Sequence, residues 1–525
     1  MARFSKPVRV QVTSKAPSMA PPDTVNLAGG KAFKLSLREA IAGAVLNAML
    51  QDSYYQSGQA GLEQVQGLID QADQAGDLLF VAKAALYARR VHGLRSISHV
   101  IAGELGDRAR GAGWKRAFYR NLPVRPDDVT EVIAYWNERH REDDGSVRRH
   151  PNPMLRGLGA AFLRFDAYQL SKWKGAKGAV QLVDFVNLAH IRPPTKGHPI
   201  HDLMNGTLKP ADTWEGSLSA VGQEVKDEDD KAVAKGKEWV RLVEEKKLPY
   251  LAAVRNLVNI GNGATEAVPG VCKLLADPEA VRKCRVFPFQ MKTAYDQVKE
   301  KVTNAANRAK LMQAVSTAMD LSVENIPELS GKTLIVVDVS GSMRGQPAEI
   351  ASLFAASVLK RNPGADFMTF ATNAQFRQPD SVGHSTLALS DLIQRFENGG
   401  GTNFAAIFQE AQGHHYDRVI IFSDMQGWLE GGAEGLQKTF RAYCARHKNR
   451  PFIYSFDLCG SGTSQFPEER VALMYGFSVK VFDVMGVLET DRHALINLID
   501  KIDLFQAIPV KGQPKKSEGE MAGKE

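Results

Sequence analysis

The pattern of apolar residues changes once along this chain of 525 residues, near residue 330. In residues 35–320, apolar positions recur at the three- and four-residue spacings of amphipathic helices, as in the stripe formed by Leu155, Leu158, Phe162 and Phe165. After residue 330, short runs rich in β-branched residues alternate with helical segments. The chain must therefore fold as two structurally different parts.

The first part is predicted to be an array of helices. Helical patterns of 12 to 20 residues follow one another, broken by Gly, Pro and Asn, and strand patterns are nearly absent. The clearest patterns cover residues 37–50, 77–91, 127–140, 154–173 and 249–260. They indicate stacked antiparallel helix pairs of the HEAT kind, although no clean period defines the number of repeats.

The second part is predicted to be a doubly wound α/β sheet. Residues 333–339 form a continuous apolar run, which is typical of a strand buried on both faces of a parallel sheet. Further strands are expected at 365–371, 418–424, 452–458 and 478–484, with helices at 347–361, 389–396, 404–412 and 435–447. Right-handed crossovers place the carboxyl ends of these strands at one edge, where ligands bind in such folds.

Oxygen-bearing side chains follow these strands at that edge. A D-x-S-x-S loop comes directly after the first strand, a Gly-rich loop opens a later helix, and a carboxylate ends the strand at 418–424. The predicted ligands are Asp338, Ser340, Ser342, Thr402 and Asp424. Hard oxygen donors of this kind suit one divalent cation, for which we expect Mg²⁺, with Mn²⁺ or Ca²⁺ as alternatives.

These three loops resemble the metal-ion-dependent adhesion site of von Willebrand A domains, and the resemblance covers about residues 331–510. It implies that the hydroxyls of Ser340, Ser342 and Thr402 contact the ion, while Asp338 and Asp424 bind it directly or through water. No general base can be named beside these residues. We therefore expect the site to bind a ligand without catalysing a reaction.

The positive charge of the chain lies in the helical part. Residues 1–330 contain 46 Lys and Arg against 37 Asp and Glu, whereas residues 331–525 contain 20 against 22. An excess of nine positive charges on one part favours a polyanionic partner there. The alternative is that these residues only keep the helices soluble. No run of about 18 apolar residues occurs, so we expect no membrane span and a cytoplasmic location.

A basic helical array followed by an A-type domain resembles the TROVE module of the Ro ribonucleoprotein family. The segments that carry this resemblance are residues 161–173, 182–194, 248–261 and 285–295. It implies a monomeric ring of helices that is sealed by the A domain. Small structured Y-type RNA would bind the outer surface, single-stranded ends of misfolded RNA would enter the hole, and an exoribonuclease is a further partner to consider.

The expected domains follow from these patterns and from the resemblance. Residues 1–30 form a flexible basic arm, residues 31–328 the TROVE helical-repeat domain, residues 331–510 the von Willebrand A-like domain and residues 511–525 a flexible tail. In this scheme the helical domain carries the RNA-binding surface.

Five residues are predicted to bind the structured RNA. By resemblance to the family, the region of Lys172 and the residue His190 match its Y RNA surface, and the charge of Arg192 is retained beside them. The complete set is Lys172, Lys174, Lys177, His190 and Arg192. Trp173 would add a stacking surface. The alternative for these positions is a solvated helix end with a packed Trp and an ordinary structural His.

The sequence thus favours a non-catalytic RNA-binding protein that acts in RNA quality control, RNA processing or stress survival. Two alternatives from other classes stay open. The first is a protein-interaction scaffold whose cation captures an acidic residue of a partner. The second is a nuclease or another RNA-processing enzyme. Nucleic acid that co-purifies with the protein separates the scaffold from the RNA-binding protein, and turnover of labelled RNA identifies an enzyme.

Overall fold

The structure of the protein is a computed structural model, and it divides into two compact units. The mixed unit comprises Met1–Leu62 and Asp212–Asn497, and the helical unit comprises Glu63–Ala211 and Leu498–Glu525. The structure describes residues 20–47, 58–173, 179–193, 195–209, 214–224, 227–284, 286–396, 399–460, 462–466, 470–475, 485, 489 and 493–506.

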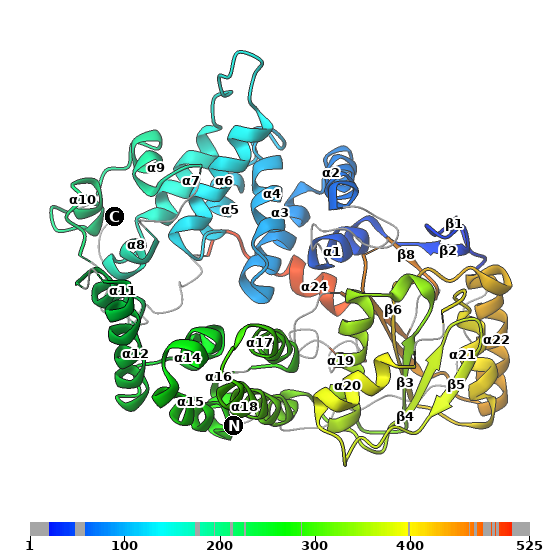
Figure 1. The fold of residues 1–525 in the computed structure, drawn as a ribbon. Coiled ribbons are helices and arrows are strands. Elements are labelled where there is room, and N and C mark those ends of the chain that lie inside the picture. Colours follow the sequence, from blue (N-terminus) through cyan, green and yellow to red (C-terminus); the bar gives the residue numbers. More distant parts are fainter. Residues whose placement is uncertain are drawn as a thin grey trace, which may run out of the picture. The chain divides into compact units, whose positions relative to one another are not determined.

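The helical unit is built from short helices (Figure 1). They are α2 (Gly58–Gln74), α3 (Leu78–Tyr87), η1 (Ala88–His92), α4 (Ser96–Glu104), α5 (Lys115–Asn121), α6 (Pro126–Arg139), α7 (Asn152–Phe162), α8 (Ala167–Trp173), α9 (Leu182–Leu188) and α10 (Pro199–Met204). Their buried residues are mostly apolar. Helices α5 and α7 approach closely at Gly157, where an added Cβ would lie 2.5 Å from the Cβ of Tyr119. Only glycine permits this packing.

A buried carboxylate ties four segments of the helical unit together. Asp128, in the first turn of α6, is 0% exposed and accepts hydrogen bonds from Arg89 Nη2 at 2.6 Å and from Arg95 Nε at 3.3 Å. The ring of His99 lies 3.0 Å away, and the backbone N–H groups of Val124 and Arg125 also donate to Asp128. The carboxylate therefore caps α6 and neutralises buried cations at the same time.

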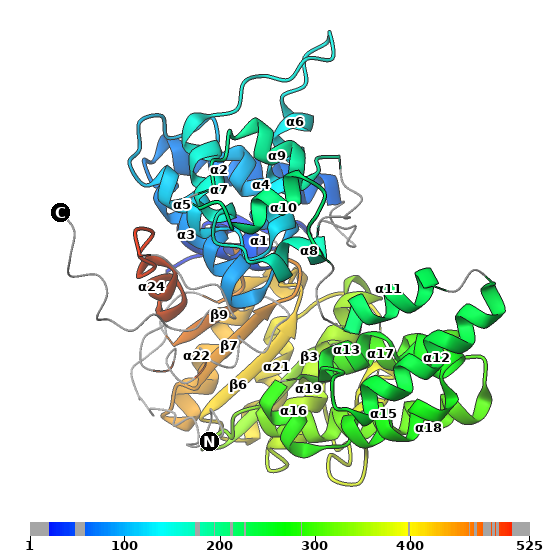
Figure 2. The same cartoon turned by 90° about the vertical axis from the view of Figure 1, so that its left-hand side faces the viewer.

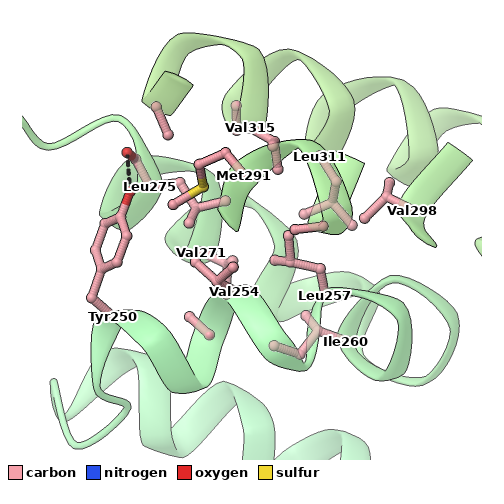
Figure 3. Close-up of a cluster of buried hydrophobic side chains, with 14 of the residues drawn as sticks. Tyr250, Val254, Leu257, Ile260, Val271, Leu275, Met291, Val298, Leu311 and Val315 are labelled. Atoms are coloured by element: carbon pink, nitrogen blue, oxygen red, sulfur yellow. Dashed lines mark hydrogen bonds between the residues drawn. The ribbon is translucent and has the colours of Figure 1, made fainter. Parts of the chain in front are cut away.

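The helices of the mixed unit form a second apolar core. They are α11 (Trp214–Glu224), α12 (Glu228–Glu244), α13 (Tyr250–Arg255), α14 (Leu257–Gly263), η2 (Thr265–Ala267), α15 (Val268–Leu275), α16 (Pro278–Cys284), α17 (Pro288–Lys301), α18 (Ala305–Ser322) and η3 (Val323–Asn325). Figure 3 shows Val271, Met291 and Leu311 meeting between these helices. The hydroxyl of Tyr250 donates to the carbonyl of Leu275 at 3.0 Å, so its buried polar end is satisfied.

The mixed unit also contains a six-stranded sheet with the order β5-β4-β3-β6-β7-β9. The strands are β3 (Thr333–Asp338), β4 (Asp366–Phe370), β5 (Ala374–Arg377), β6 (Arg418–Ser423), β7 (Phe452–Asp457) and β9 (Val471–Tyr475). Only β5 is antiparallel to its neighbour, and every residue of β3, β6 and β7 is buried. Figure 2 shows β3, β6, β7 and β9 side by side. The strand predicted at 478–484 lies outside the described residues.

Helices cover both faces of this sheet. They are η4 (Gly341–Met343), α19 (Gln346–Arg361), α20 (Thr386–Gln394), α21 (Phe404–Glu410), η5 (Ala411–Gly413), η6 (Leu429–Gly431) and α22 (Ala433–His447), and α24 (Ala494–Asp500) follows. On one face Phe354 of α19 packs against Phe422 of β6. On the other face Phe408 of α21 packs against Phe440 of α22. The prediction of a helical N-terminal part followed by a doubly wound α/β sheet is confirmed, whereas closure into a ring stays a prediction.

The N-terminal segment joins the α/β part of the mixed unit. Strands β1 (Thr24–Val25) and β2 (Lys31–Lys34) form a hairpin that pairs with β8 (Thr463–Ser464), and α1 (Leu37–Asn47) follows. Figure 1 shows β1 and β2 beside β8. Residues 24–30, which the sequence assigns to a flexible arm, are thus held in a hairpin. Its contacts outside the hairpin are with residues about 400 positions away, so no local pattern could reveal them.

None of the helices in the described residues has both the length and the apolar character needed to cross a membrane.

Candidate functional site

The five predicted cation ligands lie on loops at the carboxyl end of the sheet. Asp338 ends β3, Ser340 and Ser342 follow in the turn at η4, and Asp424 comes directly after β6. Thr402 lies just before α21. Because β3 and β6 are parallel neighbours, their carboxyl ends meet at one edge. All five residues are buried, with exposed fractions between 0% for Asp424 and 5% for Ser342.

Hydrogen bonds connect three of these residues. The backbone N–H of Ser340 donates to Asp338 Oδ1 at 2.9 Å, and the hydroxyls of Ser340 and Ser342 lie 3.2 Å apart. Ser342 lowers the pKa of Asp424, although the opposite effect of burial is larger. Ser423, which the sequence prediction missed, donates its hydroxyl to Asp338 Oδ2 at 2.6 Å. Asp424 could be predicted because a carboxylate at the end of a strand is a common cation ligand. A Ser at the end of a strand is not distinctive, so Ser423 could not be predicted.

Backbone contacts bring the Gly-rich loop to the same place. The N–H of Gly341 donates to the carbonyl of Gly400 at 3.2 Å, which joins this loop to the D-x-S-x-S turn. The carbonyl of Thr402 accepts from the N–H of Trp428 at 3.1 Å, which joins it to the loop after β6. Positive φ angles of 62° at Gly399 and 89° at Gly400 explain why glycine is required in this loop. The structure therefore brings the three predicted loops together.

The electrostatics of the site favour a cation. Burial raises the pKa of Asp338, and the neighbouring charge of Asp424 raises it further. Burial also raises the pKa of Asp424. Two carboxylates held close together away from water repel each other, and a divalent cation between them would offset that repulsion. The donors are all oxygens, so the chemistry of the set fits Mg²⁺.

The same site is poor in charged ligands. Across the described ranges, no group of three or more His, Cys, Asp or Glu residues could hold a metal ion. With two carboxylates, a cation at Asp338 and Asp424 would rely on hydroxyls and water for its other ligands. Mg²⁺ usually keeps several waters and takes few protein carboxylates, so this composition is compatible with it.

Three of the five predicted RNA-binding residues fall within the described part of the chain. Lys172 lies in the last turn of α8, and His190 and Arg192 follow α9; all three are exposed. His190 has a φ of 48°, and its N–H donates to the carbonyl of Asn187 at 3.2 Å to end the helix. Lys174 and Lys177 lie outside the described residues.

The structure adds Arg125 to this region and changes the role expected for Trp173. The guanidinium carbon of Arg125 lies 3.8 Å from the centre of the Trp173 ring, within the range of a cation–π contact. One face of the indole is therefore already covered, which favours the packed alternative for Trp173 over base stacking. Arg125 comes directly before α6, and nothing in its local sequence indicated this contact.

Comparison with known families gives a match to the TROVE domain over residues 207–346. The crystal structure of the Deinococcus radiodurans Ro (RSR) protein has the same fold, with a TM-score of 0.57. It is 15% identical, and the match covers 86% of this chain and 100% of that chain. One segment of our chain therefore matches the TROVE domain, and the fold of the chain is that of the Ro protein. The TROVE match includes Asp338, Ser340 and Ser342 but ends before Thr402 and begins after Arg192.

Other comparisons add little. The proximal thread matrix protein 1 from the mussel byssus is 16% identical over 36% of this chain and 52% of that chain, and its TM-score of 0.21 is too low to support an argument. A search of curated proteins gave no match.

Proposed function

We propose that this protein belongs to the TROVE family and is the non-catalytic RNA-binding subunit of a Ro-type ribonucleoprotein. Its ligands would be small structured Y-type RNA and single-stranded ends of misfolded RNA, in RNA quality control, processing or stress survival. One observation carries the proposal: the TROVE match and the Ro fold agree, and the fold covers the whole length of the D. radiodurans Ro protein. The basic excess of residues 1–330 supports a polyanionic partner.

The second part of the proposal is one divalent cation in a domain of the von Willebrand A type. Asp338, Ser340, Ser342, Thr402 and Asp424 would hold it, with Mg²⁺ as the expected ion. When bound, it would neutralise two buried carboxylates and offer a coordination position to an acidic group of a partner. The protein side chains hold and orient the ion, and no proton transfer is assigned to them.

Crosslinking in cells, followed by purification and sequencing of the bound RNA, tests the main proposal. A defined set of small stem-loop RNAs is the expected result. Recovery of the protein without nucleic acid and with an acidic protein partner would favour the scaffold alternative instead. Degradation of labelled RNA by the purified protein, sensitive to Asp424→Ala, would contradict the non-catalytic assignment.

Replacing Lys172 and Lys174 by Ala should weaken binding of a stem-loop RNA. Each phosphate contact that is lost should also flatten the slope of log affinity against log salt by about 0.7 to 0.9, because fewer counterions are released. Filter binding over a series of salt concentrations measures both effects. Lys237→Ala with Lys273→Ala removes the same charge from exposed positions of the mixed unit and serves as the control.

His190 should contribute to RNA binding with little effect on the salt slope, because its ring would act by hydrogen bonding or stacking and not by a phosphate contact. The left-handed backbone at this position makes His190→Asn the suitable change, since Asn tolerates that conformation. Single-stranded RNA should be affected less than the stem-loop by both sets of changes. Equal loss of both RNA classes, or of neither, would contradict an RNA surface at these residues.

A further inference from the structure

The N-terminal hairpin of residues 24–34 contacts the loop that follows β6, residues 424–432, which begins with the proposed ligand Asp424. Both segments belong to the mixed unit. Asn26 Nδ2 donates to the carbonyl of Gly427 at 2.7 Å, and Ala28 N donates to Gln426 Oε1 at 3.2 Å. Asn26 is 5% exposed and Gln426 is 0% exposed. The two segments thus meet through buried polar contacts.

The two backbones also lie in direct contact. A Cβ added to Gly30 would lie 2.1 Å from the carbonyl oxygen of Gly427 and 2.6 Å from Trp428 Cα. A Cβ added to Gly432 would lie 2.6 Å from the carbonyl oxygen of Lys31. Both glycines are needed for this approach, one on each side. The contact is therefore specific to this pair of segments and leaves no room for a shifted register.

Gln426 extends the contact to the proposed cation site. Its backbone N–H donates to Asp424 Oδ1 at 3.1 Å, and its side-chain amide donates to the carbonyl of Asp424 at 3.2 Å. The same side chain accepts from Ala28 through Oε1. One buried residue thus connects the hairpin with the carboxylate. Trp428, two residues further, binds the carbonyl of Thr402, a second proposed ligand.

The loop between β6 and α22 needs such support. Met425 has a φ of 60°, Glu430 a φ of 51° and Gly432 a φ of 61°. Left-handed conformations at residues other than glycine are unfavourable by about 1 to 3 kcal/mol each and persist when the surrounding structure holds them. The hairpin supplies hydrogen bonds on one side of this loop. On the other side Gln465 Nε2 donates to the carbonyl of Met425 at 3.0 Å.

We infer that the N-terminal hairpin is a fourth element of the cation site, in which Asn26 and Gln426 are positioning residues that hold Asp424 and the Thr402 loop in place. This inference rests on the proposed cation site. Positioning and binding are linked: if the hairpin holds the loop in the form that binds the ion, the ion must in turn stabilise the hairpin.

Titration of the full-length protein with Mn²⁺, followed by electron paramagnetic resonance, tests the positioning role. Asn26→Ala and Gln426→Ala should each weaken Mn²⁺ binding by about tenfold, a typical magnitude for coupled sites. Ser36→Ala is the control, because Ser36 caps α1 next to the hairpin and accepts from the N–H of Glu39, away from residues 424–432. The Mn²⁺ affinity of Ser36→Ala should equal that of the wild type. A loss of affinity in Ser36→Ala as large as in Asn26→Ala and Gln426→Ala would overturn the inference.

Hydrogen exchange supplies a measurement that needs no variant. In the wild-type protein, Mg²⁺ should slow exchange of two backbone amides. Ala28 donates to Asn26 Oδ1 and to Gln426 Oε1, and Gly30 donates to Asn26 Oδ1. In Gln426→Ala the effect of Mg²⁺ on Ala28 should be reduced. Wild-type Mn²⁺ affinity in both variants, or exchange that does not respond to Mg²⁺, overturns the hairpin inference and leaves the cation site standing. Absence of Mn²⁺ binding by the wild type overturns the cation site and the inference together.

Discussion

Replacement of Asp338 and Ser340 by Ala should abolish cation binding by the full-length protein. Asp338 and Ser340 lie in one hydrogen-bonded network with Ser342, and the two substitutions remove one of the two carboxylates of the proposed ligand set. Mg²⁺ gives up bound water reluctantly, and one carboxylate with fewer hydroxyls would not compensate for the waters that it must lose. Calorimetry with Mg²⁺ and Mn²⁺ should show one site per chain in the wild type and none in the double variant.

The same experiment has a matched control and a stability readout. Asp380→Ala removes an exposed carboxylate from the same part of the chain and should leave binding unchanged. A bound cation raises the free energy of unfolding by RT ln(1 + [L]/Kd), so Mg²⁺ should raise the melting temperature of the wild type and of the control variant only. Undiminished binding by the double variant would show that the ion, if it binds, occupies another place.

Much of the sheet and of its site could be predicted, because the information is local. The apolar run that becomes β3 is uninterrupted, as a strand buried on both faces requires, and β6 and β7 have the same character. Because β3 and β6 are parallel neighbours, their carboxyl ends lie at the same edge of the sheet, and so do Asp338 and Asp424. The helical part was predictable for a similar reason, because the apolar residues on the buried face of a helix recur every three or four positions in the sequence.

The elements that were missed depend on distant partners. β5 is half-exposed along its length and β9 alternates between half-buried and buried residues, so neither contains the continuous apolar run of a central strand. The hairpin of β1 and β2 is held by residues 426–428 and by β8, and the close contacts of Gly30 and Gly432 appear only when both segments are present. In the same way, Arg125 and Trp173 are 48 residues apart in sequence, and only the fold brings them together.

The hairpin also changes how the α/β part should be studied. A fragment that starts at residue 331 lacks β1, β2 and α1, whose Asn47 donates to the carbonyl of Asp457 at 2.8 Å. It would also leave Tyr475 without Gly43, which lies against its ring. For this reason the cation and RNA measurements proposed above use the full-length chain.

In the helical unit, Asp128→Ala should lower the free energy of unfolding by about 3 to 5 kcal/mol, because it leaves a buried cation without its counter-charge. Arg89 is 6% exposed and donates to Asp128 through both Nε and Nη2. The N–H groups of Val124 and Arg125 lose their acceptor as well. Urea denaturation followed by circular dichroism measures the change. Asp70→Ala, which breaks an exposed ion pair with Arg108, should cost less than about 1 kcal/mol.

The contribution of Asp128 should also depend on pH in a defined direction. Burial alone would raise the pKa of this carboxyl, but the hydrogen bond from His99 and the charges of Arg89 and His99 outweigh burial and hold its pKa well below the ordinary value. A carboxyl whose pKa is depressed by folding stabilises the native state above its unfolded pKa, about 3.9, and loses that contribution as the pH falls below it.

Comparison of the wild type with Asp128→Asn at several pH values isolates this effect, because the amide keeps the shape of the side chain and removes its charge. The difference in unfolding free energy should shrink as the pH falls below about 4, where the unfolded wild type takes up a proton that its folded form resists. A difference that stays constant down to pH 3 would mean that Asp128 acts through the geometry of its hydrogen bonds and not through its charge.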